Sequence, residues 1–333
     1  ERGVDGFRLD TVNFYFHSQG LENNPPVRPE EFNASTAPAV NPYNLQEHLY
    51  DKSRPENIAF LQRMRALLNE YPGTTAVGEI GDAQHQLEIM AQYTSGNDKL
   101  HMCYTFDYLG GEYTAPHFRD ALRLTQEKAP DGWICLAFSN HDVVRHVSRW
   151  APHGFEDRLT RQTALLLMTM RGSVCLYQGE ELGLTEAEIA YDDLVDPYGI
   201  ESHVRNGGFS TANRTWLPVP AQHLPYAVDQ QDNVANSILS LYRAILRFRR
   251  EHPVLIKGDL ELVEGVPETV LAFTRTVGED KLFCAFNMAP EPIIVDVPDG
   301  LVLEDAGAPG ADAQLEANRL SFGPFGAYIG RMN

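Results

Sequence analysis

Apolar residues follow two alternating patterns from the start of the chain to about residue 251. Short runs rich in β-branched and aromatic residues have the length of single strands. Between them, apolar residues recur at i, i+3 and i+4, as they do on one face of a helix. The expected strands span residues 3–10, 74–80, 100–107, 133–142 and 173–177. The expected helices span residues 54–70, 82–93, 115–127, 157–171 and 233–251. Strands that alternate with helices in this way indicate parallel β/α units and an α/β fold.

The pattern changes at about residue 253. From there on, short β-rich runs such as 270–274 and 282–286 are separated by Gly, Pro and Asp, and no further helical pattern appears. We therefore predict a first domain over residues 1–252 and an antiparallel β domain over residues 253–333. Residues 185–232 of the first domain are rich in Pro, Gly and Asp, which is typical of a long loop insertion.

Three of the expected strands end in a carboxylate, at Asp10, Glu79 and Asp142. The carboxyl ends of neighbouring parallel strands meet at one face of a barrel, so these side chains are candidates for a shared site. Side chains alternate along a strand, so Arg8 points the same way as Asp10, and its guanidinium favours the ionised carboxylate. Glu79 has no adjacent base in the sequence, which suits a carboxyl group that must hold a proton. Taken alone, the pair of Arg8 and Asp10 is equally consistent with a structural ion pair at a strand end.

The motifs around these carboxylates occur in a characteristic order. They are Gly6-Phe7-Arg8-Leu9-Asp10, Gly78-Glu79-Ile80, Ser139-Asn140-His141-Asp142 and, further along, residues 174–183. In this order and spacing they resemble the conserved regions of the α-amylase family of glycoside hydrolases. The resemblance is closest to the exo-acting α-glucosidases and oligo-glucosidases of that family, and it covers most of the chain.

The resemblance implies a role for each candidate residue. Asp10 would be the nucleophile, Glu79 the general acid and base, and Asp142 the carboxylate that stabilises the transition state. Arg8 and His141 would contact the reacting groups, with His141 donating to a sugar hydroxyl. Retaining glycosidases use two carboxyl groups about 5–5.5 Å apart, so we expect this separation between Asp10 and Glu79.

The resemblance also implies a TIM (β/α)8 barrel. Such a barrel needs eight strands, and the patterns above predict five. In the family the strand that carries the nucleophile is the fourth, so we expect the chain to hold strands 4–8 and to lack the first three β/α units. Unpaired sheet edges and uncovered strand faces then predict that residues 1–333 alone are neither stable nor active.

The substrate is indicated by the residue that follows the nucleophile. Family members selective for α-1,6 bonds tend to have Val there, and those that prefer α-1,4 bonds have a smaller or polar residue. Thr11 therefore favours short α-1,4-linked substrates such as maltose, or sucrose. Phe106, near the end of an expected strand, either stacks on a sugar face or packs in the core. Residues 196–210 lack the Arg-Asp-Gly-x-Arg-Thr-Pro stretch whose second Arg binds the terminal glucose in the exo-glucosidases, which leaves the recognition of that sugar open.

The sequence therefore predicts a retaining α-glucosidase that forms a covalent glucosyl-Asp intermediate, with transglucosylation as a further activity. One alternative is a non-catalytic relative, such as the membrane-transporter subunits that resemble this family but have lost the carboxylates. The presence of Asp10, Glu79 and Asp142 argues against it. The other alternative is an inactive fragment of a barrel.

The net charge indicates which classes of partner are compatible with the chain, and the cysteines indicate its cellular compartment. The formal net charge is −19, from 27 basic and 46 acidic residues. This disfavours nucleic acid or an anionic membrane surface as a partner and fits a neutral α-glucoside or oligosaccharide. The cysteines lie in apolar runs without metal-ligand spacing, so we expect four buried thiols, no metal and a reducing, cytoplasmic location. They are Cys103, Cys135, Cys175 and Cys284.

No stretch approaches the ~18 apolar residues that a membrane span needs. We expect no membrane partner and no cofactor, and the sequence leaves the oligomeric state open.

Overall fold

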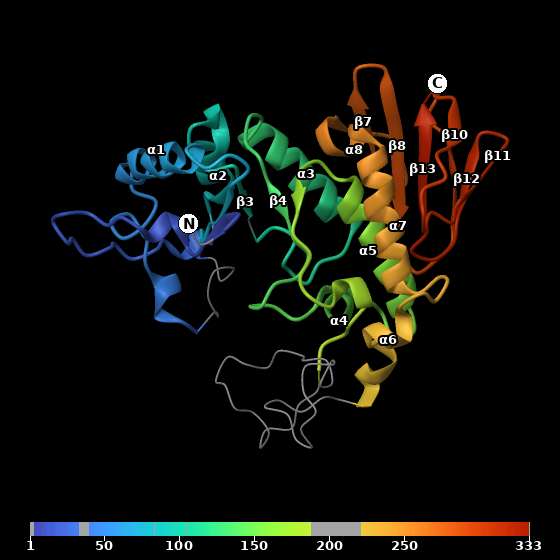
Figure 1. Ribbon diagram of the computed structural model, residues 1–333, viewed down its shortest axis with the longest axis horizontal. Coiled ribbons are helices and arrows are strands. Elements are labelled where there is room, and N and C mark those ends of the chain that lie inside the picture. Colours follow the sequence, from blue (N-terminus) through green and yellow to red (C-terminus); the bar gives the residue numbers. More distant parts are fainter. Residues whose placement is uncertain (1–2, 33–39, 83, 105, 188–220, 333) are drawn as a thin grey trace. The chain divides into compact units, whose positions relative to one another are not determined.

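The computed structural model describes residues 3–32, 40–82, 84–104, 106–187 and 221–332 (Figure 1). The chain forms two compact units. The first unit comprises Glu1–Gly110 and Asp120–Leu136, and the second comprises Gly111–Arg119 and Ala137–Asn333. The domains that the sequence predicts, residues 1–252 and 253–333, divide the chain differently and stay a prediction.

The first unit contains a parallel sheet of three strands. They are β1 (Gly6–Leu9), β2 (Thr75–Glu79) and β3 (Met102–Tyr104), in the order β1-β2-β3. The register pairs Leu9 with Gly78 and Glu79 with Tyr104, so the carboxyl ends of the three strands lie at the same edge. This confirms the prediction of neighbouring parallel strands that end in Asp10 and Glu79.

The apolar residues of β1 are poorly covered. Phe7 is 51% exposed, and Arg8 beside it is also exposed. Within this sheet β1 is an edge strand that pairs only with β2, and its apolar residues are therefore less covered than those of β2, where Ala76 is fully buried.

The helices α1 (Glu56–Asn69), α2 (Gln86–Thr94) and α3 (Ala115–Lys128) match the helical patterns of this region closely. α2 begins four residues later than predicted, at Gln86 rather than at Asp82. The Asp82 carboxylate accepts hydrogen bonds from the main-chain N–H groups of Gln84 and His85, at 3.0 and 2.7 Å. Such a side-chain-to-backbone turn competes with helix formation and delays the helix.

Five further α-helices lie in the described part of the second unit. Their bounds are α4 (His146–Trp150), α5 (Glu156–Thr169), α6 (Val228–Gln231), α7 (Ile238–Glu251) and α8 (Pro253–Lys257). α5 and α7 lie side by side (Figure 1). The Ser237 hydroxyl caps α7 by accepting from Ser240 N at 3.1 Å, which is why α7 begins later than the predicted residue 233. The prediction of no helix beyond residue 253 is wrong, because Pro253 occupies the first turn of α8, where proline is favoured.

The antiparallel β structure predicted for the end of the chain is confirmed. One sheet has the order β10-β13-β8-β7-β6 and another has the order β11-β12-β9. The strands are β6 (Asp259–Leu262), β7 (Val270–Val277), β8 (Asp280–Asn287), β9 (Ile293–Asp296), β10 (Leu303–Asp305), β11 (Gln314–Glu316), β12 (Arg319–Phe322) and β13 (Ala327–Met332). Side chains from both sheets, among them Phe283, Val295 and Leu320, form one apolar core.

Two of the predicted strands are much shorter than their apolar runs. β4 covers only Cys135–Leu136 and β5 only Ser173–Val174. Most of the predicted insertion at 185–232 lies outside the described residues, and its described end holds a 3-10 helix, Ala221–Tyr226, followed by α6.

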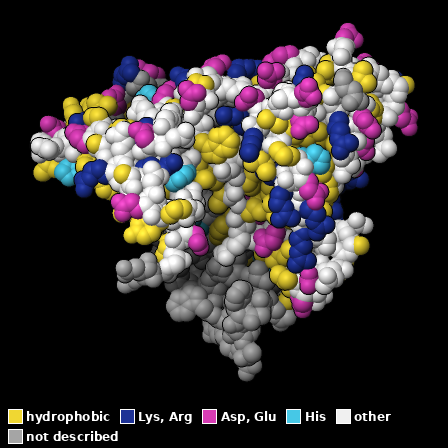
Figure 2. Space-filling model, turned by 45° about the horizontal axis from the view of Figure 1, so that its top comes forward, with side chains coloured by type: hydrophobic (Ala, Val, Ile, Leu, Met, Phe, Trp, Pro, Cys, Tyr) yellow, Lys and Arg dark blue, Asp and Glu magenta, His cyan; other side chains and the backbone are white. Residues whose placement is uncertain are grey.

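The four cysteines all lie among the described residues, and none of them forms a disulfide bond. Cys103, Cys135 and Cys284 are buried as predicted, but Cys175 is exposed, because it lies just beyond the short strand β5. No helix in the described part of the chain is both long and apolar enough to cross a membrane. Acidic and basic side chains are interspersed over the visible face of the molecule, with hydrophobic ones between them (Figure 2).

Candidate active site

One guanidinium joins the ends of the three strands of the parallel sheet β1-β2-β3. Arg8 donates through Nη1 to Asp10 Oδ1, as the alternation along β1 predicts. Its Nη2 lies 2.8 Å from Glu79 Oε2 at the end of β2 and donates to Tyr104 Oη, 2.9 Å away, at the end of β3. Burial lowers the pKa of Arg8, but the hydrogen bonds to Tyr104 and Asp10 outweigh burial and raise it. Arg8 is therefore a permanent cation between two carboxylates.

Glu79 is buried, with 4% of its surface exposed, and both of its carboxylate oxygens are engaged. Oε2 accepts from Arg8 and from the main-chain N–H of Thr11, at 3.1 Å. Oε1 accepts from the Tyr104 hydroxyl at 2.5 Å. Glu79 has no adjacent base in the sequence, but the fold brings the Arg8 guanidinium to it from another strand. β1 and β2 pair in a register that sets Arg8 opposite Val77, and the long Arg8 side chain reaches Glu79 from there.

Asp10 is far more open than Glu79. Its side chain is 72% exposed, compared with 5% for the side chain of Glu79. A carboxylate that attacks a substrate needs an open approach, whereas a carboxyl group that exchanges a proton benefits from fixed partners. The two carboxyl groups therefore differ in exposure, and their expected roles stay predictions.

Thr11 takes part in the site through its backbone. Its φ of 40° and ψ of 50° lie in the left-handed region, where β-branched residues are rarely found. This conformation turns the chain after Asp10 and directs the Thr11 N–H to Glu79 Oε2. The expected role of the Thr11 side chain in choosing the substrate stays a prediction.

Phe106 lies next to Tyr104. The centroids of the two rings are 6.1 Å apart, with an angle of 56° between the ring planes. The main-chain N–H of Phe106 donates to Gln86 Oε1 at 3.2 Å, and its side chain is half-buried. The ring contact with Tyr104 is compatible both with stacking of Phe106 on a sugar and with packing of Phe106 in the core.

His141 and Asp142 belong to the second unit and contact each other there. Asp142 Oδ2 lies 3.6 Å from His141 Nε2, and more than half of each side chain is exposed. Asp142 does not end a strand as predicted, because β4 stops at Leu136. It lies in a turn in which Asn140 Oδ1 accepts from the Asp142 N–H at 2.8 Å.

Buried polar residues hold this turn. The Ser139 hydroxyl accepts from His146 N at 2.9 Å, and His146 Nε2 lies 3.1 Å from the Thr163 hydroxyl on α5. Glu180 is 2% exposed, and its Oε1 lies 3.4 Å from His146 Nδ1. These contacts fix the start of the His141–Asp142 segment to the body of the second unit.

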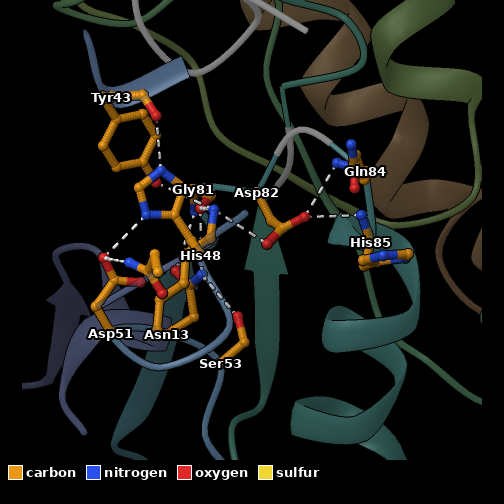
Figure 3. A network of polar contacts seen from close by, with 11 residues as sticks. Asn13, Tyr43, His48, Asp51, Ser53, Gly81, Asp82, Gln84 and His85 are labelled. Carbon is orange, nitrogen blue, oxygen red and sulfur yellow. Dashed lines mark hydrogen bonds and ion pairs between the residues drawn. The ribbon is translucent and has the colours of Figure 1, made fainter. Parts of the chain in front are cut away.

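Asn13 ties together the segments that follow β1 and β2 (Figure 3). Its Oδ1 accepts from the main-chain N–H of Gly81 at 3.1 Å, and its Nδ2 donates to the carbonyl of Gly81 at 3.2 Å. The same Nδ2 donates to the hydroxyl of Ser53 at 3.1 Å. Asn13 is fully buried, so this amide continues the pairing of the two strands beyond Asp10 and Glu79.

A buried ion pair contacts the same segment as the Asn13 amide. Lys52 is 7% exposed, and its Nζ is 3.2 Å from Asp82 Oδ2. The ammonium also donates to the Tyr43 hydroxyl and to the carbonyl of Gly81, at 3.1 and 3.3 Å. Burial raises the pKa of Asp82, but Lys52 and the main-chain donors of Gln84 and His85 outweigh burial and hold that pKa below its ordinary value.

A polar cavity of about 230 Å³ adjoins the ion pair. His48 lines it and is held by Asp51, 2.9 Å away, and by stacking on Tyr43 (Figure 3). The cavity is lined by Val27, Arg28, Tyr43, Asn44, Gln46, Glu47, His48, Leu49, Lys52, Asp82, Gln84 and His85.

Tyr104, Asn13 and Lys52 are absent from the residues that sequence reasoning selects. A signal for Tyr104 exists, because it precedes Phe106 by two residues in a predicted strand and therefore shares its face. Asn13 and Lys52 lie in irregular segments, where no period indicates which way a side chain points. Across the described residues, no three His, Cys, Asp or Glu side chains are arranged to hold a metal ion.

Comparison with known proteins relates the chain to enzymes that act on glucosides. Residues 1–258 match the family model for the α-amylase catalytic domain. The whole chain is 48% identical to a probable alpha-glucosidase of Rhizobium meliloti (strain 1021), of which it covers 63%. It is 24% identical, over 91% of its length, to an oligo-1,6-glucosidase of Parageobacillus thermoglucosidasius, of which it covers 60%.

Among solved structures, the alpha-glucosyl transfer enzyme XgtA is similar to the whole chain, with a TM-score of 0.92 and 36% sequence identity. The chain covers 64% of the XgtA chain. It therefore spans roughly three fifths of the length of the relatives described here.

Proposed function

Since the chain belongs to the α-amylase family, we propose that the protein is a retaining α-glucosidase. It hydrolyses terminal α-glucosyl residues of short α-1,4-linked substrates such as maltose, or sucrose, and transfers them to acceptors. The observation that carries this proposal is the bridge from Arg8 to both Asp10 and Glu79. That bridge joins an exposed carboxylate and a buried one across neighbouring parallel strands, as a two-carboxylate mechanism requires.

The proposed reaction has two steps. In the first, the Asp10 carboxylate attacks the anomeric carbon, the glycosidic C–O bond breaks, and Glu79 gives its proton to the departing oxygen. In the second, Glu79 takes a proton from water or from an acceptor hydroxyl, whose oxygen displaces Asp10 from the anomeric carbon. Asp142 stabilises the positive charge that develops on the sugar, and His141 donates to a sugar hydroxyl.

The fold of the site fits the same proposal. β1, β2 and β3 run parallel in consecutive order, as neighbouring strands of a TIM barrel do. We assign them to strands 4, 5 and 6 of a (β/α)8 barrel, with strands 7 and 8 following in the chain. Residues 253–333 form the accompanying antiparallel β domain.

The relatives bear on the substrate and on transfer. The relative that is 48% identical is named a probable alpha-glucosidase, which supports glucoside hydrolysis. XgtA, at 36% identity, is an alpha-glucosyl transfer enzyme, which supports transfer to an acceptor as a second activity. Thr11 after Asp10 favours α-1,4 over α-1,6 bonds. The four cysteines, none of them in a disulfide bond, support a reducing location such as the cytoplasm.

The test compares Glu79→Gln with the wild type in the full-length protein. Maltose needs its leaving oxygen protonated, whereas a dinitrophenyl α-glucoside has a leaving group that departs without help. We expect kcat/KM to fall by a factor on the order of 10²–10⁴ on maltose and by far less on the aryl glucoside. Proton NMR should show that the glucose first formed from the dinitrophenyl α-glucoside is the α anomer.

The matched control is Glu88→Gln, which neutralises a half-exposed carboxylate on α2 that pairs with Lys128. It should leave both substrates unaffected. Equal losses on the two substrates in Glu79→Gln would remove Glu79 from the acid role. Initial formation of β-glucose from the aryl glucoside would show inversion and overturn the nucleophilic role of Asp10.

A further inference from the structure

The Tyr104 hydroxyl lies between the two charged groups of the site. It donates to Glu79 Oε1 at 2.5 Å and accepts from Arg8 Nη2 at 2.9 Å. Tyr104 is 7% exposed, and its ring packs against Phe106. The residue pairs with Glu79 in the register of β2 and β3, so its backbone is held as firmly as that of Glu79 itself.

The other two contacts of Glu79 can only donate. A guanidinium and a main-chain N–H have no acceptor function, so Arg8 and Thr11 N can contact only an oxygen of Glu79 that carries no proton. The proposed reaction requires Glu79 to alternate between carboxylic acid and carboxylate. A phenol hydroxyl both donates and accepts, so Tyr104 alone among these three groups can also accept from the O–H of the acid form.

Resting on the function proposed above, we infer that Tyr104 is a positioning residue for Glu79. Its hydroxyl donates to Glu79 Oε1 when Glu79 is ionised and accepts from it when Glu79 carries the proton. Tyr104 thereby fixes the direction of the carboxyl group through both steps. Among the described residues of the first unit, the charged and titratable groups in contact with Glu79 are Arg8 from β1 and Tyr104 from β3, and Asp10 contacts Arg8 in turn.

Tyr104 is suited to this role because it stays protonated. Burial and the neighbouring Glu79 carboxylate both raise the pKa of Tyr104 above its ordinary value. The phenol is therefore a hydrogen-bond partner and not a base in its own right at any pH where the enzyme would work.

The test is Tyr104→Phe in the full-length protein, which removes the hydroxyl and keeps the ring. Loss of a donor to the carboxylate makes the acid form of Glu79 persist to higher pH. We expect the alkaline limb of the kcat/KM profile on maltose to move upward by about 0.5–1 pH unit. We also expect kcat on maltose to fall on the order of 10-fold at little change in KM, with a smaller loss on the dinitrophenyl α-glucoside.

Tyr93→Phe is the matched control. Tyr93 is a buried tyrosine of α2 whose hydroxyl accepts from Asn57 at 2.9 Å, away from the candidate site. This variant should lose stability but keep the wild-type pH profile. A Tyr104→Phe variant whose alkaline limb stays in place, or whose losses are equal on both substrates, would overturn the inference.

A second substitution keeps the proposal testable even where Tyr104→Phe disturbs folding. Replacement of Tyr104 by 3-fluorotyrosine retains the hydroxyl and makes it a stronger donor, so the alkaline limb should move downward; an unchanged limb contradicts the inference. The Glu79→Gln comparison separates this outcome from the parent proposal. If Glu79→Gln shows the expected dependence on the leaving group and neither change at Tyr104 moves the profile, only the positioning role fails.

Discussion

At the scale of single residues, Lys52 is a buried charge that holds the segment following the Glu79 strand. Its ammonium has an anionic partner in Asp82 and two oxygen acceptors, in Tyr43 and Gly81. It also lies 5.5 Å from the ring centroids of Phe14 and Tyr43, within the range of a cation–π contact. The segment that carries Gly81 directly follows the Glu79 strand, so the position of Lys52 bears on the position of Glu79.

We expect Lys52→Met to destabilise the protein by about 3–5 kcal/mol, because it leaves the buried Asp82 carboxylate without a counter-charge. Urea unfolding at pH 7 measures the change in the free energy of unfolding. Lys128→Met is the control, since Lys128 and its partner Glu88 are both more than a third exposed. Breaking that pair should change the free energy by about 0–1 kcal/mol.

The effect of Lys52 should depend on pH. The pKa of Asp82 in the folded protein is below its ordinary value. The stability that the ion pair contributes is therefore fully present above the unfolded pKa of about 3.9 and is lost as the pH falls through the lower folded pKa. The difference between the wild type and Lys52→Met should be largest at neutral pH and shrink as the pH falls, because protonation of Asp82 first relieves the unpaired charge of the variant and then breaks the ion pair of the wild type. A difference that stays the same down to about pH 2.5 would contradict this account.

The sequence predicts part of the site at this scale and misses another part for a physical reason. The contact of Arg8 with Asp10 follows from alternation within one strand, which the sequence contains. The contact of Arg8 with Glu79 depends on the register between β1 and β2, which no local pattern specifies. Asp142 is found through its motif, but its turn depends on the Asn140 side chain, which competes with strand formation.

At the scale of elements, the β7–β8 hairpin depends on one glycine. Val277 pairs with Asp280, so Gly278 and Glu279 form a two-residue loop, and Gly278 has a φ of 60°. Glycine adopts this conformation without steric cost, and the tightest hairpin turns require it.

We expect Gly278→Ala to destabilise the protein by about 1–2 kcal/mol, the cost of placing a Cβ in the left-handed region. No atom lies within 4 Å of the added Cβ, so the cost comes from the backbone and not from a clash. Gly111→Ala is the control, because its Cβ also meets no atom within 4 Å and its φ is not positive. It should change stability by less than about 0.5 kcal/mol in the same urea titration, and an equal loss in both variants would contradict the argument.

The predicted helix bounds agree with the structure where the apolar pattern is long. They disagree where a single residue determines the point at which the helix begins. α1, α3, α5 and α7 have several turns of apolar periodicity and end within a few residues of the predicted bounds. The start of α2 depends on the Asp82 side chain, which outweighs the local helical pattern. The short helix α8 depends on Pro253, which ends the pattern of α7 and yet begins a new turn.

At the scale of the whole molecule, charge opposes folding. With a net charge of −19, repulsion between acidic groups destabilises the compact folded state. Raising NaCl from 10 to 150 mM shortens the screening length from ~30 to ~8 Å. We expect the melting temperature in a thermal scan at pH 7 to rise by a few degrees over that range. The rise should shrink near pH 5, where the net charge is smaller, and a melting temperature that falls with salt would contradict this view.

The division of the chain into units is the least predictable feature. A change of period marks where local pattern changes, but it does not show which distant segments pack together. Residues 111–119 belong to the second unit. There Tyr113 donates to Gln162 at 2.8 Å and Arg119 donates to the carbonyl of Val270 at 3.0 Å. Both partners are remote in sequence, so neither contact is visible in a window of neighbouring residues.

The left-handed backbone of Thr11 has a consequence for engineering and for natural variation at this position. A random library at residue 11 samples two properties at once, the chemistry of the side chain and the ease with which the backbone keeps φ at 40°. Gly and Asn at position 11 relieve the strain of the left-handed backbone, and Pro removes the N–H that binds Glu79. Neither effect tests whether the side chain at position 11 contacts the sugar. Thr and Val share the same branching, so Thr11→Val changes the hydroxyl while nearly preserving the backbone preference. That exchange is the informative one for linkage selectivity, and selections that enrich Gly or Asn at position 11 record relief of strain instead.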